Sequence, residues 1–418
     1  MPESSNLLVF VVAIPAFVLS IAWEWWRSTR REEPLYEVAD TLTNLHLGSG
    51  QLLVSLLTKA PLLALYYAVH QWATAQGVPT WSQTSWGAWI IGFLIMDCAY
   101  YWFHRLSHEV NFLWAAHAVH HQSERYNLSV ALRQSWAQQI FSGVFYMPLA
   151  LLGIPVEMFF LLNALNTLSQ FWIHTQLIGK LGPLELFLNT PSHHRVHHGV
   201  DDDYVDKNYA GFLIIWDRMF GTFTEETSSP RYGVIKPLRS WSPLWANLDV
   251  WAQLWRRARR GALRVSELVQ LPLRPPAWRG NAEAPPSVKL RTDHDYLLYK
   301  DRGALWLYGA LMGVIDILLG SALIIVAPQL STVEVGCGVA FILLSATLHS
   351  GCVEGRSWAR LGAWSRIGLG VAVVWLAQAG WIPLLASSLV VIGWGALHIG
   401  AALLLTWCTR RARRAHLA

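Results

Sequence analysis

The stretch WGAWIIGFLIMDCAYYWFHRLSH, residues 86–108, joins an apolar run directly to a pair of histidines. The apolar part, 86–103, approaches the roughly 20 residues that a membrane-spanning helix needs. His104 and His108 follow at a spacing of four, and side chains with that spacing project from one face of a helix. The stretch therefore predicts a helix that leaves the membrane and carries its histidines at the boundary.

Similar apolar runs recur along the chain. They lie at 7–26, 50–69, 304–326, 333–350, 367–384 and 387–407. A longer run, 136–172, contains Gly-Ile-Pro at 153–155, which predicts two short spans that return to the side they left. With 53% hydrophobic and 14% charged residues, the chain is too apolar for an ordinary soluble protein. We expect an all-α fold, a polytopic membrane bundle with a cytosolic histidine-box domain.

The positions of the basic residues indicate an orientation in the membrane. Basic clusters follow the first apolar run, separate two late runs and end the chain, whereas the connections 71–85 and 327–332 contain no Lys or Arg. The clusters are Arg27, Arg30 and Arg31; Arg356, Arg360 and Arg366; and Arg410, Arg411, Arg413 and Arg414. This positive-inside pattern predicts that 104–135 and 173–303 lie in the cytosol, at a bacterial inner membrane or the endoplasmic reticulum. It explains the net charge of +5 better than nucleic-acid binding does.

Composition divides the chain into three parts. Residues 1–235 interleave apolar runs with histidine-rich segments, 236–303 form a polar connecting segment, and 304–418 form a second apolar block that predicts four spans. Within the connecting segment, LWANLDVWAQLWRRARR (244–260) has the spacing of an amphipathic helix. Such a helix lies at the membrane surface or packs on the cytosolic domain, and the sequence leaves both open. The four cysteines have no close pairs and indicate neither a disulfide framework nor a Cys-x-x-Cys site.

Ten of the sixteen histidines fall between residues 104 and 198, and eight of them form three boxes. The boxes are HRLSH at 104–108, HAVHH at 117–121 and HRVHH at 194–198, the last preceded by His193. Any one histidine in a membrane protein is most simply a hydrogen-bonded packing residue. Eight in matching helical registers are better explained by metal ligation, since neutral imidazole is a common ligand. A tetrahedral ion takes four ligands, so the boxes predict two ions.

Imidazole binds iron, copper and zinc alike, and the residue type leaves the metal open. A dimetal centre at the membrane boundary, within reach of lipid chains, favours oxygen chemistry on C–H bonds and hence a redox metal. Asp97 stands in helical register with His104 and His108, and a carboxylate in that position is expected to orient a ligand. The alternative is that Asp97 pairs with Lys59 of a neighbouring span.

Three segments resemble the fatty acid hydroxylase and sterol desaturase superfamily of membrane diiron enzymes, and within it the alkylglycerol monooxygenase branch. They are HEVNFLWAAHAVHHQSERYNLSVALRQS (108–135), FWIHTQLIGKLGPLELFLNTPSHHRVHHG (171–199) and DKNYAGFLIIWDRMFGTF (206–223). The resemblance implies a cytosol-facing site with two Fe ions. Its ligands would be His104, His108, His117, His120, His121, His194, His197 and His198, with His174 and His193 as two more.

The resemblance also implies a reaction. Alkylglycerol monooxygenases use O₂ and tetrahydrobiopterin to cleave an ether lipid to glycerol and a fatty aldehyde, so lipid from the bilayer, O₂ and a reduced pterin or another electron donor are the expected partners. It further implies that Glu109 matters for activity, although on its own Glu109 reads as a solvated helix charge. Asp217, in IIWDR, would support a ligand or pair locally with Arg218.

Three other functions are compatible with parts of the pattern. A diiron hydroxylase or desaturase of a sterol, a hopanoid or an aminolipid acyl chain would use the same centre. A metal transporter is a non-enzymatic alternative, but transport sites need weak, exchangeable ligands rather than converging boxes. A bis-histidine haem protein would place lone histidines on facing spans.

Overall fold

The computed structural model describes residues 3–31, 34–259, 263–278, 304–378, 397 and 399–408. Throughout these residues the regular structure is helical, as the sequence predicts. The chain forms two compact units that interleave along the sequence. Unit 1 comprises 1–37, 58–238 and 247–294, and unit 2 comprises 38–57, 239–246 and 295–418. Unit 1 contains every predicted metal ligand.

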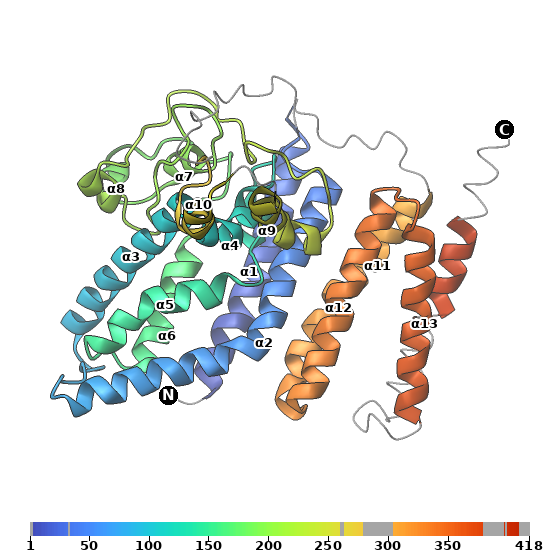
Figure 1. Cartoon of the computed structure of the whole chain (residues 1–418), viewed down its shortest axis with the longest axis horizontal. Coiled ribbons are helices and arrows are strands. Elements are labelled where there is room, and N and C mark those ends of the chain that lie inside the picture. Colours follow the sequence, from blue (N-terminus) through green and yellow to red (C-terminus); the bar gives the residue numbers. More distant parts are fainter. Residues whose placement is uncertain are drawn as a thin grey trace. The chain divides into compact units, whose positions relative to one another are not determined.

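The lower part of unit 1 is built from long apolar helices (Figure 1). They are α1 (Glu3–Ser28), the second half of α2 (Val38–Ala75), α3 (Trp86–Glu109), α5 (Gln138–Leu151) and α6 (Val156–Ser169). Side chains of α2, α3, α5 and α6 form one core around Tyr66, Met96, Leu149 and Met158, all almost completely buried. The core fixes α3 against α5 and α6, and so fixes the direction in which the end of α3 presents its histidines.

The run 136–172 folds as the hairpin that its Gly-Ile-Pro sequence predicts. Helices α5 and α6 are 14 residues each and are separated by 152–155. Gly153 turns the chain with a φ of 86°, a conformation that side chains disfavour. A Cβ atom there would lie 2.2 Å from the carbonyl oxygen of Pro79, so only glycine fits this turn.

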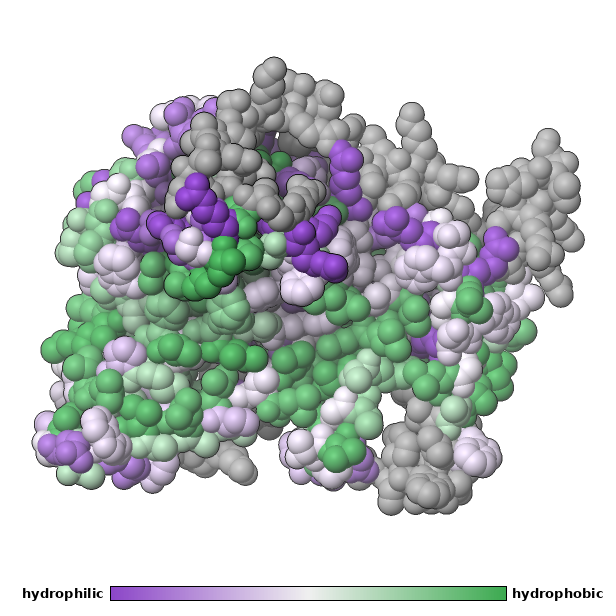
Figure 2. Space-filling view, in the orientation of Figure 1, coloured by the Kyte–Doolittle hydropathy of each residue, from purple (hydrophilic) through white to green (hydrophobic). Residues whose placement is uncertain are grey.

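Shorter elements cover the ends of these helices and carry most of the histidines. They are α4 (Asn111–His121), η1 (Leu128–Leu132), η2 (Gly182–Leu186), α7 (Pro191–His197), α8 (Ile215–Phe220), α9 (Pro243–Arg259), α10 (Val265–Gln270) and η3 (Leu271–Leu273). Figure 2 shows hydrophobic surface over α3, α5 and α6 and hydrophilic surface around α7 and α8. This division is the one expected of a membrane bundle with a polar cap.

Unit 2 contains α11 (Ala304–Val326), η4 (Ala327–Gln329), α12 (Thr332–Val353), α13 (Ala359–Gln378) and the first half of α2. Asp316 of α11 is fully buried and accepts hydrogen bonds from His349 Nδ1 at 2.6 Å and Arg366 Nη2 at 3.2 Å. Arg366 therefore balances a buried carboxylate inside the bundle. Its assignment to a charged connection between spans was wrong, because α13 begins at Ala359 and includes it.

Three described helices are long and apolar enough to cross a membrane. They are Val38–Ala75, Leu305–Gln329 and Thr332–Val353, and they indicate a multi-pass membrane protein. The predicted spans 7–26 and 86–103 lie within helices α1 and α3. Part of the predicted span 367–384, most of 387–407 and residues 279–303 of the connecting segment lie outside the described residues.

Candidate metal centre

Nine of the ten predicted ligands gather in two buried clusters. Cluster A contains His104, His108, His117, His121 and His197, and cluster B contains His120, His174, His194 and His198. In each cluster one ligand atom per residue lies within 4.8 Å of all the others. The clusters are adjacent, because the rings of His121 and His198 stack with centroids 4.3 Å apart. The geometry thus offers two neighbouring sites, as the sequence predicts.

The two His-x-x-His-His boxes each divide between the clusters instead of serving one ion each. Helix α4 gives His117 and His121 to cluster A and His120 to cluster B. Helix α7 and its C-cap give His197 to cluster A and His194 and His198 to cluster B. At 3.6 residues per turn, positions i and i+4 lie about 40° apart, whereas i+3 and i+4 lie about 100° apart. Each box therefore directs its i, i+4 pair into one cluster and its third histidine, at i+3, into the other cluster.

Ring nitrogens within the clusters approach one another at distances that suit a shared ion. Nε2 of His117 lies 3.0 Å from Nε2 of His104 and 3.2 Å from Nε2 of His121. In cluster B, Nε2 of His174 lies 3.2 Å from that of His120 and 3.0 Å from that of His194. Two nitrogens, each about 2.1 Å from one ion and about 90–110° apart, would be separated by about 3.0–3.4 Å. The observed spacing matches this arrangement.

The opposite nitrogen of several rings donates to a backbone carbonyl. Nδ1 of His104 donates to Tyr209 O at 2.7 Å, Nδ1 of His120 to Arg133 O at 2.9 Å, and Nδ1 of His174 to Gln170 O at 2.8 Å. Nδ1 of His197 donates in the same way to Lys207 O at 3.0 Å. A proton on Nδ1 leaves a lone pair on Nε2 and fixes the ring, which is the usual support for a ligating imidazole.

Burial keeps these imidazoles neutral. Burial, with repulsion between neighbouring rings when both are charged, holds the pKa of His117, His121 and His197 well below the ordinary value. Burial lowers the pKa of His120 to about 4. Nε2 of His197 and Nε2 of His198 are buried and have no hydrogen-bond partner in the described part of the chain. A buried polar atom without a partner is costly, and a metal ion at these positions would satisfy both.

His174 reaches cluster B from a loop and is held there by its neighbours. Thr175 donates its hydroxyl to the carboxylate of Glu24 at the end of α1. Arg195 of α7 donates through Nη1 to Thr175 O at 3.0 Å and to Ile178 O at 2.7 Å. Its Nε and Nη2 form a two-bond fork with Glu226, at 2.6 and 2.7 Å. Charge-assisted forks of this kind are geometrically strict, so they fix the loop beside His174.

Asp97 and Asp217 both accept hydrogen bonds from the backbone of the same segment, residues 209–213. Asp217 accepts from Tyr209 N and Ala210 N, both at 2.8 Å, and from the hydroxyl of Thr222 at 2.7 Å. Burial raises the pKa of Asp217, and these three hydrogen bonds partly counter that increase. Because Tyr209 O accepts from His104, Asp217 supports a cluster A histidine through one residue of backbone.

Asp97 binds the other end of this segment, so it supports the clusters only indirectly. It accepts from Phe212 N at 2.9 Å and Leu213 N at 3.0 Å, and also from Asn166 and the indole of Trp216. The expected direct contact with a ligating histidine is not among its hydrogen bonds. The alternative partner, Lys59, places its ammonium 4.3 Å from the centre of the Phe160 ring.

Two other predicted site residues lie outside the clusters. The ring of His193 packs edge-on against Phe223, with centroids 5.3 Å apart, and His193 belongs to neither group of converging ligand atoms. Glu109 is 39% exposed and accepts from Nε of Arg105, one helical turn earlier, at 2.9 Å. The structure therefore brings together the eight box histidines and His174, but not His193 or Glu109.

Several supporting residues were missed by sequence reasoning. The carbonyls of Tyr209, Arg133 and Lys207 carry no sequence signal, because any residue supplies the same oxygen. Arg195 and Glu24 could have been found. A cation inside a histidine box and an acidic residue at the end of an apolar run both need partners when buried.

Comparison with known proteins agrees with the geometry. Residues 89–222 match the fatty acid hydroxylase family. The chain is 45% identical to alkylglycerol monooxygenase of Danio rerio over 249 residues, 59% of this chain and 54% of that protein. It is 42% identical to alkylglycerol monooxygenase of Homo sapiens over 250 residues, again 59% and 54%. It is 30% identical to an ornithine lipid hydroxylase of Rhizobium tropici over 225 residues, 51% and 64%.

The chain spans about half the length of the alkylglycerol monooxygenases that it matches. No solved structure is significantly similar to it. The matched residues 89–222 contain every histidine of both clusters, together with Asp97 and Asp217. This segment of the chain, which holds both clusters, is therefore similar to the fatty acid hydroxylase family.

Proposed function

We propose that clusters A and B each bind one iron ion and that the protein is a membrane monooxygenase acting on the alkyl chain of a lipid. The observation that carries this proposal is the pair of adjacent clusters of nine buried histidines, in which four pairs of Nε2 atoms approach at 3.0–3.2 Å. A structural zinc ion takes four ligands, whereas cluster A offers five. The family match supports iron as the metal.

A bound iron pair would supply the redox chemistry that lets O₂ react with an unactivated C–H bond. One oxygen atom of O₂ enters that bond as a hydroxyl, and the other leaves as water with two electrons and two protons from a donor. The histidines of clusters A and B hold the metal. Asp217 and Asp97 fix the segment 209–213 behind His104, and the tightly packed cap excludes bulk water from the clusters.

The most favoured substrate is an alkylglycerol, because alkylglycerol monooxygenases share 42–45% identity with the chain. Hydroxylation of the carbon beside the ether oxygen gives a hemiacetal. Its C–O bond then breaks, releasing glycerol and a fatty aldehyde. We propose a reduced pterin as the electron donor and the cytosolic side as the location of the cap, following the placement of basic residues.

A direct assay tests this proposal. Iron-loaded full-length protein in lipid nanodiscs is given an alkylglycerol and O₂, with and without tetrahydrobiopterin, and fatty aldehyde is measured. We expect aldehyde only when iron, O₂ and the pterin are all present. Protein that holds two irons per chain and forms no aldehyde from any alkylglycerol would contradict the substrate assignment.

Acyl-chain hydroxylation of an aminolipid is the second candidate. It is favoured by the 30% identity to an ornithine lipid hydroxylase. The two functions differ in product, because hydroxylation within an acyl chain leaves the lipid intact and 16 Da heavier, by addition of one oxygen atom. Mass spectrometry of lipids from cells with and without the protein separates a hydroxylated aminolipid from released aldehyde.

A further inference from the structure

One polar–apolar surface of unit 1 takes no part in either metal cluster. It consists of residues 247–259 of α9 and residues 263–278, which include α10 and η3, and we call it the surface pad. Val265, Val269 and Leu273 of the pad are 78%, 72% and 72% exposed. Their spacing of four places them in one stripe, and Trp255 of α9 is 64% exposed. So much exposed apolar surface on one short segment marks a contact with something apolar.

Basic side chains accompany this apolar stripe. Arg256, Arg259, Arg264 and Arg274 are all exposed. The acidic members of the pad are more withdrawn: Glu267 is buried and completes the helix cap of α10, and Asp249 is 9% exposed. An apolar stripe flanked by exposed arginines complements a membrane surface that carries negatively charged headgroups.

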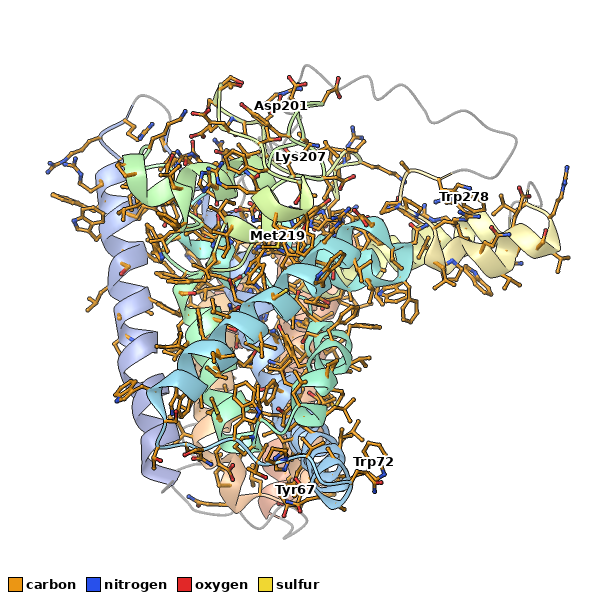
Figure 3. The ribbon with its side chains drawn as sticks, turned by 90° about the vertical axis from the view of Figure 1, so that its left-hand side faces the viewer. Tyr67, Trp72, Asp201, Lys207, Met219 and Trp278 are labelled. Carbon is orange, nitrogen blue, oxygen red and sulfur yellow. The ribbon has the colours of Figure 1, made fainter. Side chains whose placement is uncertain are left out.

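The orientation of α9 in the pad also fits a membrane surface as the partner. Figure 3 shows α9, beside the labelled Trp278, lying across the direction in which the long helix α1 runs. This orientation is the one that an amphipathic helix has when it lies along the membrane surface with one face among the lipids.

The pad is bonded directly to the turn between two histidine-bearing helices. Asn111, which follows α3 and begins α4, donates through its backbone N–H to Arg274 O at 2.9 Å. Its side chain donates to Leu271 O at 2.9 Å and to Pro275 O at 3.2 Å. The neighbouring Phe112 packs edge-on against Trp251 of α9, with ring centroids 5.1 Å apart. Contact between the pad and a membrane would therefore affect the position of the turn that separates His108 from His117.

We propose that the surface pad binds the anionic lipid surface of the bilayer and that it anchors the histidine-bearing turn at that surface. Val265, Val269, Leu273 and Trp255 enter the region between headgroups and acyl chains, and the four exposed arginines contact lipid phosphates. This inference does not depend on which lipid, or which reaction, the metal clusters serve.

Site-directed spin labelling tests the proposal. Single cysteines are placed at Val265, Val269 and Leu273 and, as a water-exposed control, at Asp203, an exposed residue of the cap outside the pad. The labels are introduced into full-length protein whose native cysteines are replaced and whose fold is checked by gel filtration. Leu318 of α11, 63% exposed in a candidate span, gives the lipid reference. Collision with O₂, which concentrates in lipid, is compared with collision with a water-soluble nickel chelate.

In nanodiscs that contain phosphatidylglycerol, labels at the three stripe positions should resemble Leu318 and the label at Asp203 should favour the nickel reagent. Nanodiscs of phosphatidylcholine alone, or replacement of the four arginines by glutamine, should raise nickel access at the stripe severalfold. Nickel access equal to that of Asp203 in both lipids would overturn the proposal. Labels shielded from both reagents would also overturn it, because they would show that protein covers the stripe.

Discussion

Asp217 gives the sharpest test of how the cap supports the metal clusters. Replacing it by asparagine keeps its shape but turns one carboxylate oxygen into an N–H₂ group that faces a backbone N–H of Tyr209 or Ala210. One buried donor then loses its acceptor, which costs about 1–3 kcal/mol. Alanine removes the acceptor of both backbone donors, and the cost rises to about 2–6 kcal/mol. A folded domain is stable by only about 5–15 kcal/mol, so the alanine variant should accumulate poorly.

The asparagine variant should also bind iron more weakly. The segment that Asp217 holds includes Tyr209 O, the acceptor for His104 Nδ1, and loss of such indirect support typically lowers metal affinity 10- to 100-fold. The assay titrates iron-loaded protein with a chelator and follows the iron retained, alongside the melting temperature in detergent. Asp203→Asn, an exposed aspartate on the same cap, is the control. If Asp217→Asn and Asp203→Asn lose iron at the same chelator concentration, the proposed support of His104 through Tyr209 is refuted.

Four further substitutions test three separate parts of the site. His174→Ala should lower bound iron from two ions per chain to one, because it removes a cluster B ligand, whereas His193→Ala should leave two; equal iron in both variants, measured by mass spectrometry, would contradict the division. Arg195→Lys should lower the melting temperature in detergent, since lysine cannot form the two-bond fork with Glu226. An unchanged melting temperature would show that the fork does not stabilise the fold. Gly211→Ala should cost about 1–3 kcal/mol, because its Cβ would lie 2.8 Å from the ring of Tyr100; unaltered denaturant unfolding would show that the ring moves aside.

Much of the fold and most of the histidines that converge in the two clusters could be predicted because both depend on local periodicity. Apolar runs give helices, and a spacing of three or four residues puts histidines on one side of a helix. The interruption at 153–155 predicts the α5–α6 hairpin for the same local reason. His174 lies outside any box and was included only through the family resemblance, and the structure places it in cluster B.

The rest depends on contacts between distant segments, which a single sequence does not display. The i, i+3, i+4 spacing shows that three histidines share one side of a helix, but not that α4 and α7 each divide theirs between clusters A and B. Asp97 stands in register with His104, yet its carboxylate reaches backbone groups 115 and 116 residues away. His193 adjoins His194 of cluster B, but the short helix α7 turns the ring of His193 toward Phe223. Register thus identified the helices that carry the clustered histidines, and tertiary packing decides which histidines converge.

Iron bound per chain tests the central claim most directly. The full-length protein, His121→Ala and His194→Ala are each loaded with ferrous iron, dialysed and measured for iron and protein, with Mössbauer spectra of each sample. The two-cluster arrangement predicts two irons per chain in the unaltered protein, a loss confined to cluster A in His121→Ala and a loss confined to cluster B in His194→Ala. One iron per chain in the unaltered protein, or the same residual iron spectrum in both variants, would contradict it.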